Sequence, residues 1–252
     1  PGVEGRVALV TGASRGIGLV TAQLLLEKGA RVMGVARSES DLVSSGLPHF
    51  VAADLSTVEG CQRAVEETLQ TFGGTIDILV CNHGLGSAHE RPLHEQSSDV
   101  FFDSMKVNLE GPFHLTRLVM PHMVAQTYGR MVYTSSTAAL EAEPGAVGYN
   151  TSKAALCGLM RSVCLDGGIY NITANAVLPG WVRTEMADTS ARAEAQQRHT
   201  SSDVIWKERA ALYAAKRVVT PHEVAHTILF LSSDESSGVS GESIRVSLGC
   251  PL

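Results

Sequence analysis

Short apolar runs alternate with stretches in which apolar residues recur at helical spacing, and this alternation continues along the whole 252-residue chain. The runs are almost wholly apolar, which is typical of parallel strands covered by helices on both faces. The sequence therefore predicts an α/β protein with a doubly wound parallel sheet of about seven strands. The strands are expected at Arg6 to Val10, Arg31 to Ala36, Phe50 to Ala53, Ile76 to Val80, Arg130 to Thr134, Ile172 to Val177 and Ser243 to Val246.

No change in composition, internal repeat or Gly/Ser-rich linker divides the chain, so residues 1–252 are expected to form a single domain. The least patterned stretch, at about 184–215, is polar and charged and is expected to be helical in pieces. Long excursions of this kind often cover a binding site. We interpret the stretch as a substrate lid, with an inert surface excursion as the alternative.

Composition and charge narrow the class of ligand. The formal charge is −6 and the basic residues form no dense cluster, which argues against a nucleic-acid partner. The first 20 residues lack a signal-peptide pattern, and no apolar run approaches the roughly 18 residues of a membrane span. The 5 cysteines form no CxxC pair and are expected to be reduced. We therefore expect a cytoplasmic protein that binds a small molecule and no membrane.

A glycine-rich loop, Thr11 to Gly18, lies between the first expected strand and a helix expected over Ile17 to Lys28. Gly12 permits a tight turn, Gly16 lets the backbone approach a pyrophosphate, and Gly18 allows close packing of helix on strand. Unpaired N–H groups and the helix dipole attract an anion to the start of the helix. The loop is interpreted as the phosphate cradle of a dinucleotide site.

The residues at the end of the second strand indicate which dinucleotide the protein binds. A free ribose 2′-hydroxyl favours an acidic residue at this position, but the strand ends in Ala36 and Arg37. Arg37 and Arg15 would instead pair with a 2′-phosphate, so NADP(H) is expected, with NAD(H) as the less favoured cofactor. Asp54, just after the third strand, is a candidate acceptor for the adenine amino group.

A proton-transfer group is expected where Tyr149 and Lys153 follow the fifth strand at i, i+4 spacing. That spacing places both side chains on one face of a helix expected to begin at Tyr149. A neighbouring ammonium favours phenolate and is expected to lower the tyrosine pKa from about 10, which makes it a usable acid/base. Ser135 and Ser136 directly follow Thr134, at the carboxyl edge of the sheet where such folds bind ligands.

Together these motifs resemble the short-chain dehydrogenase/reductase family, of the carbonyl reductase type, over nearly the whole chain. The resemblance implies a Rossmann-like fold, hydride transfer that interconverts a ketone or aldehyde and an alcohol, and a homotetramer or homodimer. An NAD-dependent alcohol dehydrogenase of the same fold and a non-catalytic NADP(H)-binding regulatory protein are the alternatives. The resemblance also rests on Cys81-Asn82-His83-Gly84, Asn108 and Pro179-Gly180.

The resemblance assigns four catalytic residues. Tyr149 is the general acid/base, and Lys153 binds the nicotinamide ribose and lowers the tyrosine pKa. Ser136 donates a hydrogen bond to the substrate carbonyl, with Ser135 as its competitor, and Asn108 holds a water for proton relay. The residues that it places along the cofactor are Gly12, Ser14, Arg15, Gly16, Ile17, Gly18, Arg37, Asp54, Leu55, Asn82, Gly84, Tyr149, Lys153, Pro179, Gly180, Val182 and Thr184.

Two segments depart from the family pattern. His83 stands where alanine is usual, and we expect a packed, non-catalytic histidine that affects local packing and substrate shape. Val246-Ser247-Leu248-Gly249 replaces the usual Val-Asp-Gly-Gly, which leaves the subunit contacts open. Neither segment carries the expected proton-transfer group.

His222-Glu223-Val-Ala-His226 matches a zinc-binding pattern in which the glutamate activates water. However, Thr220, Pro221 and Glu223 form the pattern of a helix N-terminus in which Thr220 and Glu223 cap each other. No third ligand is expected opposite this helix. We therefore expect a structural helix over Glu223 to Leu231 and no metal.

Substrate identity is not readable from the sequence. The pocket walls are expected from Ser87 to Gln96, from Ala138 to Val147 and from the lid. Glu141 and Glu143 would favour a polar or cationic substrate if they face the pocket, and are otherwise solvated loop charges. The helical patterns over Val100 to Gln126 and Tyr149 to Leu165 carry more apolar residues than one face needs, and the resemblance implies that they pair across subunits.

Overall fold

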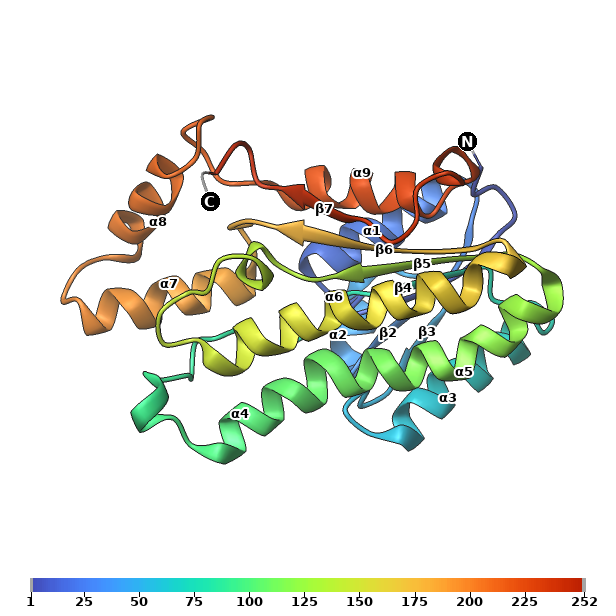
Figure 1. Cartoon of the computed structure of the whole chain (residues 1–252), viewed down its shortest axis with the longest axis horizontal. Helices are drawn as coiled ribbons and strands as arrows, with labels where there is room; N and C mark the ends of the chain where they lie inside the picture. Colours follow the sequence, from blue (N-terminus) through green and yellow to red (C-terminus); the bar gives the residue numbers. More distant parts are fainter. Residues whose placement is uncertain (1, 251–252) are drawn as a thin grey trace.

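The computed structural model describes residues 2–250, in which seven parallel strands form one sheet in the order β3-β2-β1-β4-β5-β6-β7 (Figure 1). The predicted doubly wound α/β fold is confirmed. The chain reverses its direction of growth between β1 and β4, the switch point at which such sheets bind ligands. The strands are β1 (Val7–Thr11), β2 (Arg31–Ala36), β3 (Phe50–Ala52), β4 (Ile78–Cys81), β5 (Gly129–Thr134), β6 (Ile172–Pro179) and β7 (Ser243–Val246).

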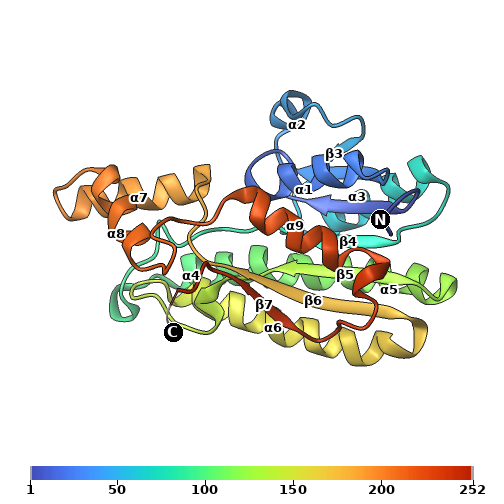
Figure 2. The same cartoon turned by 90° about the horizontal axis from the view of Figure 1, so that it is seen from above.

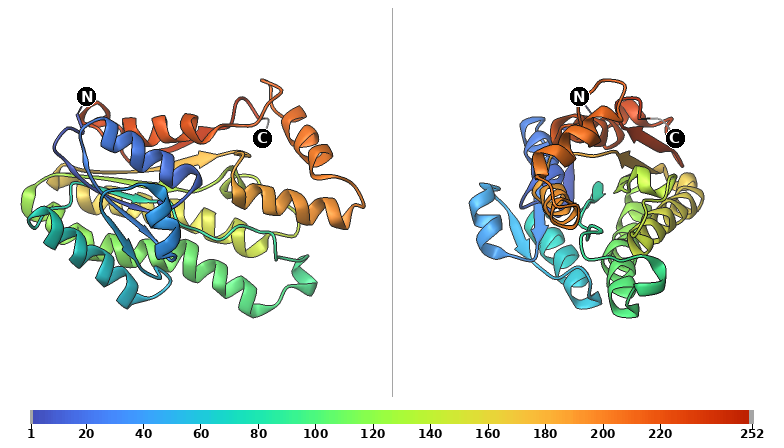
Figure 3. Two further views of the ribbon diagram at one scale, coloured as in Figure 1. Left: turned by 180° about the vertical axis from the view of Figure 1, so that it is seen from behind. Right: turned by 90° about the vertical axis from the view of Figure 1, so that its left-hand side faces the viewer.

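Helices cover both faces of the sheet, as Figure 2 and Figure 3 show from two directions. Apolar side chains of α3, α5 and α6 pack on one face, and those of α1 and α9 pack on the other. The helices are α1 (Gly16–Glu27), α2 (Glu39–Ser45), α3 (Val58–Phe72), α4 (Ser98–Met105), α5 (Gly111–Gln126), α6 (Val147–Gly167), α7 (Glu185–Gln197), α8 (Ser202–Ala211) and α9 (Pro221–Leu231).

Most expected element boundaries are correct to within two residues. β2 and β7 have the predicted bounds, whereas β4 begins at Ile78 rather than at Ile76. Asp77 explains the later start of β4. Its carboxylate accepts a hydrogen bond from the Val7 amide (2.8 Å), so this amide is not free to pair with the backbone of the segment before Ile78. β6 continues two residues beyond Val177.

α4 and α5 are joined by the π-helical turn η2 (Lys106–Glu110), which contains the fully buried Asn108. Such turns insert a residue into an α-helix and are frequent at functional sites. The apolar pattern over Val100 to Gln126 indicates only one long helical stretch, because a single extra residue has little effect on the apolar periodicity.

The segment expected to be helical in pieces forms α7 and α8, which extend beyond the carboxyl ends of the strands (Figure 1). They pack against each other through Ala191, Ile205 and Trp206, separately from the clusters on the two sheet faces. Within residues 2–250, no helix is long and apolar enough to cross a membrane.

Candidate active site

One cleft crosses the carboxyl ends of the central strands, with a volume of about 610 Å³. That volume lies in the range typical of ligand and cofactor sites. All of the predicted catalytic and cofactor residues line this cleft except Gly18 and Asn108. Of the two segments expected to form the pocket walls, only Ser87 to His89 and Glu143 line it. Most of these residues follow the end of a parallel strand, and these ends meet at one edge of the sheet, whereas Tyr149 and Lys153 reach the cleft from α6.

The glycine loop has the geometry expected of a phosphate cradle. Gly12 and Gly16 have positive φ angles of 65° and 58°, a conformation that side chains with a Cβ rarely adopt. Gly18 lies against the Gly12 carbonyl oxygen and the Asn82 side chain, so closely that a Cβ there would overlap both. Gly18 therefore acts below the cleft surface, as the contact that brings α1 close to β1.

Thr11 fixes the end of β1 to the segment that follows β4. Its Oγ1 donates to the Val80 carbonyl oxygen (3.1 Å) and accepts from the Asn82 amide (2.9 Å). His83 Nδ1 also lies 2.8 Å from this oxygen, and burial lowers the His83 pKa to about 3. His83 is thus a neutral side chain packed at the base of the cleft, in agreement with the expectation of a packed histidine.

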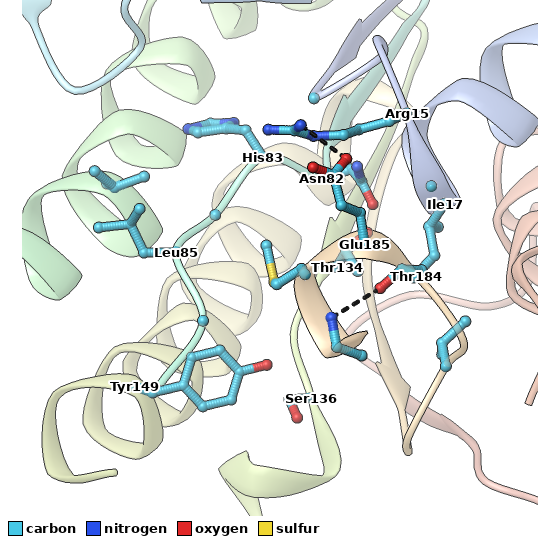
Figure 4. A pocket seen from close by; sticks show the side chains of 18 of the residues that line it. Arg15, Ile17, Asn82, His83, Leu85, Thr134, Ser136, Tyr149, Thr184 and Glu185 are labelled. Carbon is cyan, nitrogen blue, oxygen red and sulfur yellow. Dashed lines mark hydrogen bonds and ion pairs between the residues drawn. The ribbon is translucent and has the colours of Figure 1, made fainter. Parts of the chain in front are cut away.

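Basic and acidic groups lie at the end of the cleft formed by β2 and β3. Arg37 is exposed, lines the cleft and forms no ion pair with any of residues 2–250. Asp54 accepts a hydrogen bond from the Ser56 amide (3.0 Å), and hydrogen bonds from Ser56 lower its pKa. Arg15 pairs with Glu185 of α7 (2.9 Å), which links the glycine loop to the segment beyond β6 (Figure 4).

Tyr149 and Ser136 face each other at the other end of the cleft, as Figure 4 shows. The two serines after β5 are distinguished by their contacts. Ser135 is buried and its hydroxyl donates to the Lys153 carbonyl oxygen of α6 (2.8 Å), so it anchors that helix. Ser136 places its hydroxyl beside that of Tyr149, which favours Ser136 as the substrate-binding serine.

Lys153 is buried beneath the tyrosine, with its Nζ 5.7 Å from the centre of the Tyr149 ring. The expected lowering of the tyrosine pKa is not observed. Burial raises the Tyr149 pKa to about 12, and the Ser136 hydroxyl only partly opposes this rise. The ammonium has little effect because Nζ donates to the Thr134 carbonyl oxygen (2.9 Å) and burial lowers its own pKa to about 8.

Known proteins match this chain over nearly its full length. A family model described as Enoyl-(Acyl carrier protein) reductase matches residues 12–250. A Caenorhabditis elegans protein named Dehydrogenase/reductase SDR family member 4 is 32% identical over 98% of this chain and 95% of its own. The chain belongs to the short-chain dehydrogenase/reductase family. It is accordingly an oxidoreductase that acts on CH–OH groups.

Solved structures of short-chain dehydrogenases/reductases superpose closely on this chain. A variant of actinorhodin polyketide ketoreductase with NADPH has a TM-score of 0.92 and 29% identity, over 98% of this chain and 97% of that one. An NAD⁺-bound xylitol dehydrogenase has a TM-score of 0.90 and 29% identity, over 98% of this chain and 99% of that one. Because these relatives hold different nicotinamide cofactors, the family alone leaves the cofactor of this member open.

Asn108 does not reach the cleft of this short-chain dehydrogenase/reductase. Its Oδ1 accepts from the Leu85 amide (2.7 Å), and its Nδ2 donates to the Leu85 carbonyl oxygen (3.1 Å) and to Ser152 Oγ (3.0 Å). The side chain thus ties the segment after β4 to α6. A role in proton relay stays a prediction.

Glu90 does not line the cleft, but it holds the start of the helix that carries Tyr149, and the sequence did not single it out. Its buried carboxylate accepts hydrogen bonds from the amides of Gly148 (2.8 Å) and Tyr149 (2.7 Å), at the start of α6. α6 has no side-chain cap of its own at Ala146, so Glu90 caps it from a distant segment. This cap explains why α6 begins at Val147, before the expected Tyr149. Glu90 lies 58 positions before Gly148, and no local pattern links them.

The segment that follows β6 is also held by a residue that the sequence did not single out. Tyr213, just beyond α8, accepts a hydrogen bond at its hydroxyl from the Trp181 amide (2.5 Å). Thr184 N-caps α7 by accepting from the Ala187 amide (3.3 Å). These two contacts fix the course of Pro179 to Thr184 along the cleft.

The zinc-like motif has a structural explanation in this family member. Thr220 and Glu223 form the predicted capping box at the start of α9, and Glu223 also pairs with Arg217 (2.6 Å). Among the described residues, no group of three or more His, Cys, Asp or Glu side chains is placed to hold a metal ion.

Proposed function

We propose that this protein is an NADP(H)-dependent carbonyl reductase that converts a ketone or aldehyde to an alcohol. The observation that carries the proposal is the convergence of Ser136, Tyr149 and Lys153 at one end of a cleft whose other end is the glycine loop. The cofactor would lie between them, against Gly12, Gly16, Asn82 and the other predicted cofactor residues. The positive φ angles of the loop glycines fit close approach of a pyrophosphate.

NADPH supplies the hydride when it is bound. Ser136 donates a hydrogen bond to the carbonyl oxygen and so polarises it, while Tyr149 donates its proton to the same oxygen. With a pKa of about 12, Tyr149 is a neutral phenol at physiological pH and holds the proton that reduction requires. Lys153, whose Nζ lies 5.7 Å from the centre of the Tyr149 ring, would bind the nicotinamide ribose.

Burial is the main cause of the raised Tyr149 pKa, and Glu90 is expected to add to it and so to shift the pH dependence of this proton transfer. Its negative charge contributes to the raised pKa of Tyr149, so Glu90→Gln should lower that pKa. Oxidation of 1-phenylethanol with NADP⁺ requires the phenolate, and its rate should therefore begin to rise at lower pH in the variant, by up to about 1 pH unit. Glu95→Gln, an exposed change nearby, is the control. An unchanged profile, or an equal shift in both variants, would show that Glu90 acts only as a structural cap.

Cofactor selectivity is proposed to rest on Arg37. A charge-assisted contact with the 2′-phosphate would make NADPH bind about ten- to a hundredfold more tightly than NADH. Arg37→Ala should remove most of this preference by weakening NADPH alone. Nicotinamide fluorescence titration measures both constants, with Arg63→Ala on the exposed face of α3 as the control. Equal binding of the two cofactors to the unmodified protein would exclude Arg37 from the site.

We also propose that residues 1–252 fold as one domain with α7 and α8 as the substrate lid, because side chains of α7 line the cleft. A homodimer or homotetramer would cover the large apolar side chains that α4, α5 and α6 expose. These include Phe102, Phe113 and Leu165.

A further inference from the structure

Glu143 brings a carboxylate into the substrate end of the cleft. It follows the catalytic-serine segment and lines the cleft together with Ser136 and Tyr149. Its backbone is fixed to α6, because Asn150 Nδ2 donates to the Glu143 carbonyl oxygen (2.9 Å) and the Glu143 amide donates to Asn150 Oδ1 (3.3 Å). The charge of Glu143 is felt at the Tyr149 hydroxyl, whose pKa it helps to raise.

This carboxylate has no hydrogen-bond or ion-pair partner among residues 2–250. Arg209, whose charge acts on Glu143, has other partners: it pairs with Glu194 (2.9 Å) and lies 3.5 Å from the centre of the Trp181 ring. Partial burial raises the pKa of Glu143, a cost to the carboxylate that the charge of Arg209 only partly offsets. A ligand that supplies a donor would remove this cost, whereas an anionic ligand would add to it.

Glu141, two residues earlier, provides the contrast. It lies 3.5 Å from Arg245 and does not line the cleft. The sequence could not separate these two glutamates, since both lie in the same loop. Their different surroundings make Glu141 a surface ion-pair partner and leave Glu143 available to a ligand.

We propose that Glu143 selects carbonyl substrates that carry a hydrogen-bond donor, above all an ammonium group, and rejects those that carry a carboxylate. The inference rests on the proposed reductase function and names the substrate class of the same site. A site built around an unpaired polar group discriminates strongly against substrates that leave it unpaired, because the desolvation cost is then not recovered.

The test compares acetophenone with its 3- and 4-substituted aminomethyl, hydroxymethyl and carboxylate derivatives, using NADPH oxidation as the assay. For the unmodified enzyme, kcat/KM should be about ten- to a hundredfold higher for the aminomethyl compound than for the carboxylate. Glu143→Gln should bring this ratio close to one, and Glu141→Gln should leave it unchanged. The ratio is the readout because loss of the Glu143 charge also alters the Tyr149 pKa, which affects all of these substrates alike.

A ratio near one in the unmodified enzyme, or an equal change in both variants, would overturn the inference and leave the reductase function intact. Calorimetric binding of the same compounds to Tyr149→Phe saturated with NADPH gives a readout that does not need turnover. Preferential binding of the aminomethyl compound there, without any turnover by the unmodified enzyme, would support the role of Glu143 and overturn the reductase proposal. Binding without preference would overturn the role of Glu143.

Discussion

Tyr149→Phe should reduce the turnover of a carbonyl substrate by about 10²–10⁴-fold, the range typical of a lost general acid. The substitution removes only the hydroxyl, which faces Ser136 across the cleft. The ring stays above Lys153, and the glycine loop lies at the opposite end of the cleft. NADPH affinity should therefore remain close to that of the unmodified protein. Steady-state NADPH oxidation and fluorescence titration measure the two quantities.

Tyr170→Phe is the matched control for this prediction. Tyr170 packs against the apolar core beyond the end of α6 and does not line the cleft, so turnover should be unaffected. Near-normal turnover by Tyr149→Phe would exclude this hydroxyl as the proton donor. A parallel loss of NADPH affinity would instead place the tyrosine in cofactor binding.

Gly18→Ala is expected to weaken NADPH binding by at least about tenfold and to destabilise the fold by about 1–3 kcal/mol. The added Cβ would overlap the Gly12 carbonyl oxygen and the Asn82 side chain. To relieve the overlap, α1 must move away from β1, which displaces the amides that would hold the pyrophosphate. The φ angle of Gly18 is not in the left-handed region, so lack of space alone accounts for the effect.

Gly158→Ala separates this effect from the ordinary consequence of adding a methyl group to a helix. A Cβ at Gly158, within α6, meets no atom within 4 Å, and the change should leave NADPH affinity unaltered. It should stabilise the helix by up to about 1 kcal/mol. Chemical denaturation and fluorescence titration of both variants provide the comparison. If Gly18→Ala binds NADPH as tightly as Gly158→Ala does, close packing at Gly18 is not required.

The sequence by itself determined the α/β fold and most of the residues that meet in the cleft. It could do so because the periods of strands and helices are local, and the carboxyl ends of parallel strands meet at a common edge. Ser136, Arg37 and Asn82 each follow a strand that could be recognised from its own residues. Their positions along the chain therefore indicated their convergence in space.

Only the tertiary structure decided the contacts between segments that are distant in sequence, together with their electrostatic consequences. Glu90 caps α6, and the Asn108 side chain hydrogen-bonds to Leu85 and Ser152. Glu141 lies close to Arg245, whereas the carboxylate of Glu143 has no such partner among residues 2–250. The raised pKa of Tyr149 has the same origin. Its i, i+4 spacing to Lys153 is local, but burial depends on everything packed around the ring, and burial outweighs the effect of the ammonium.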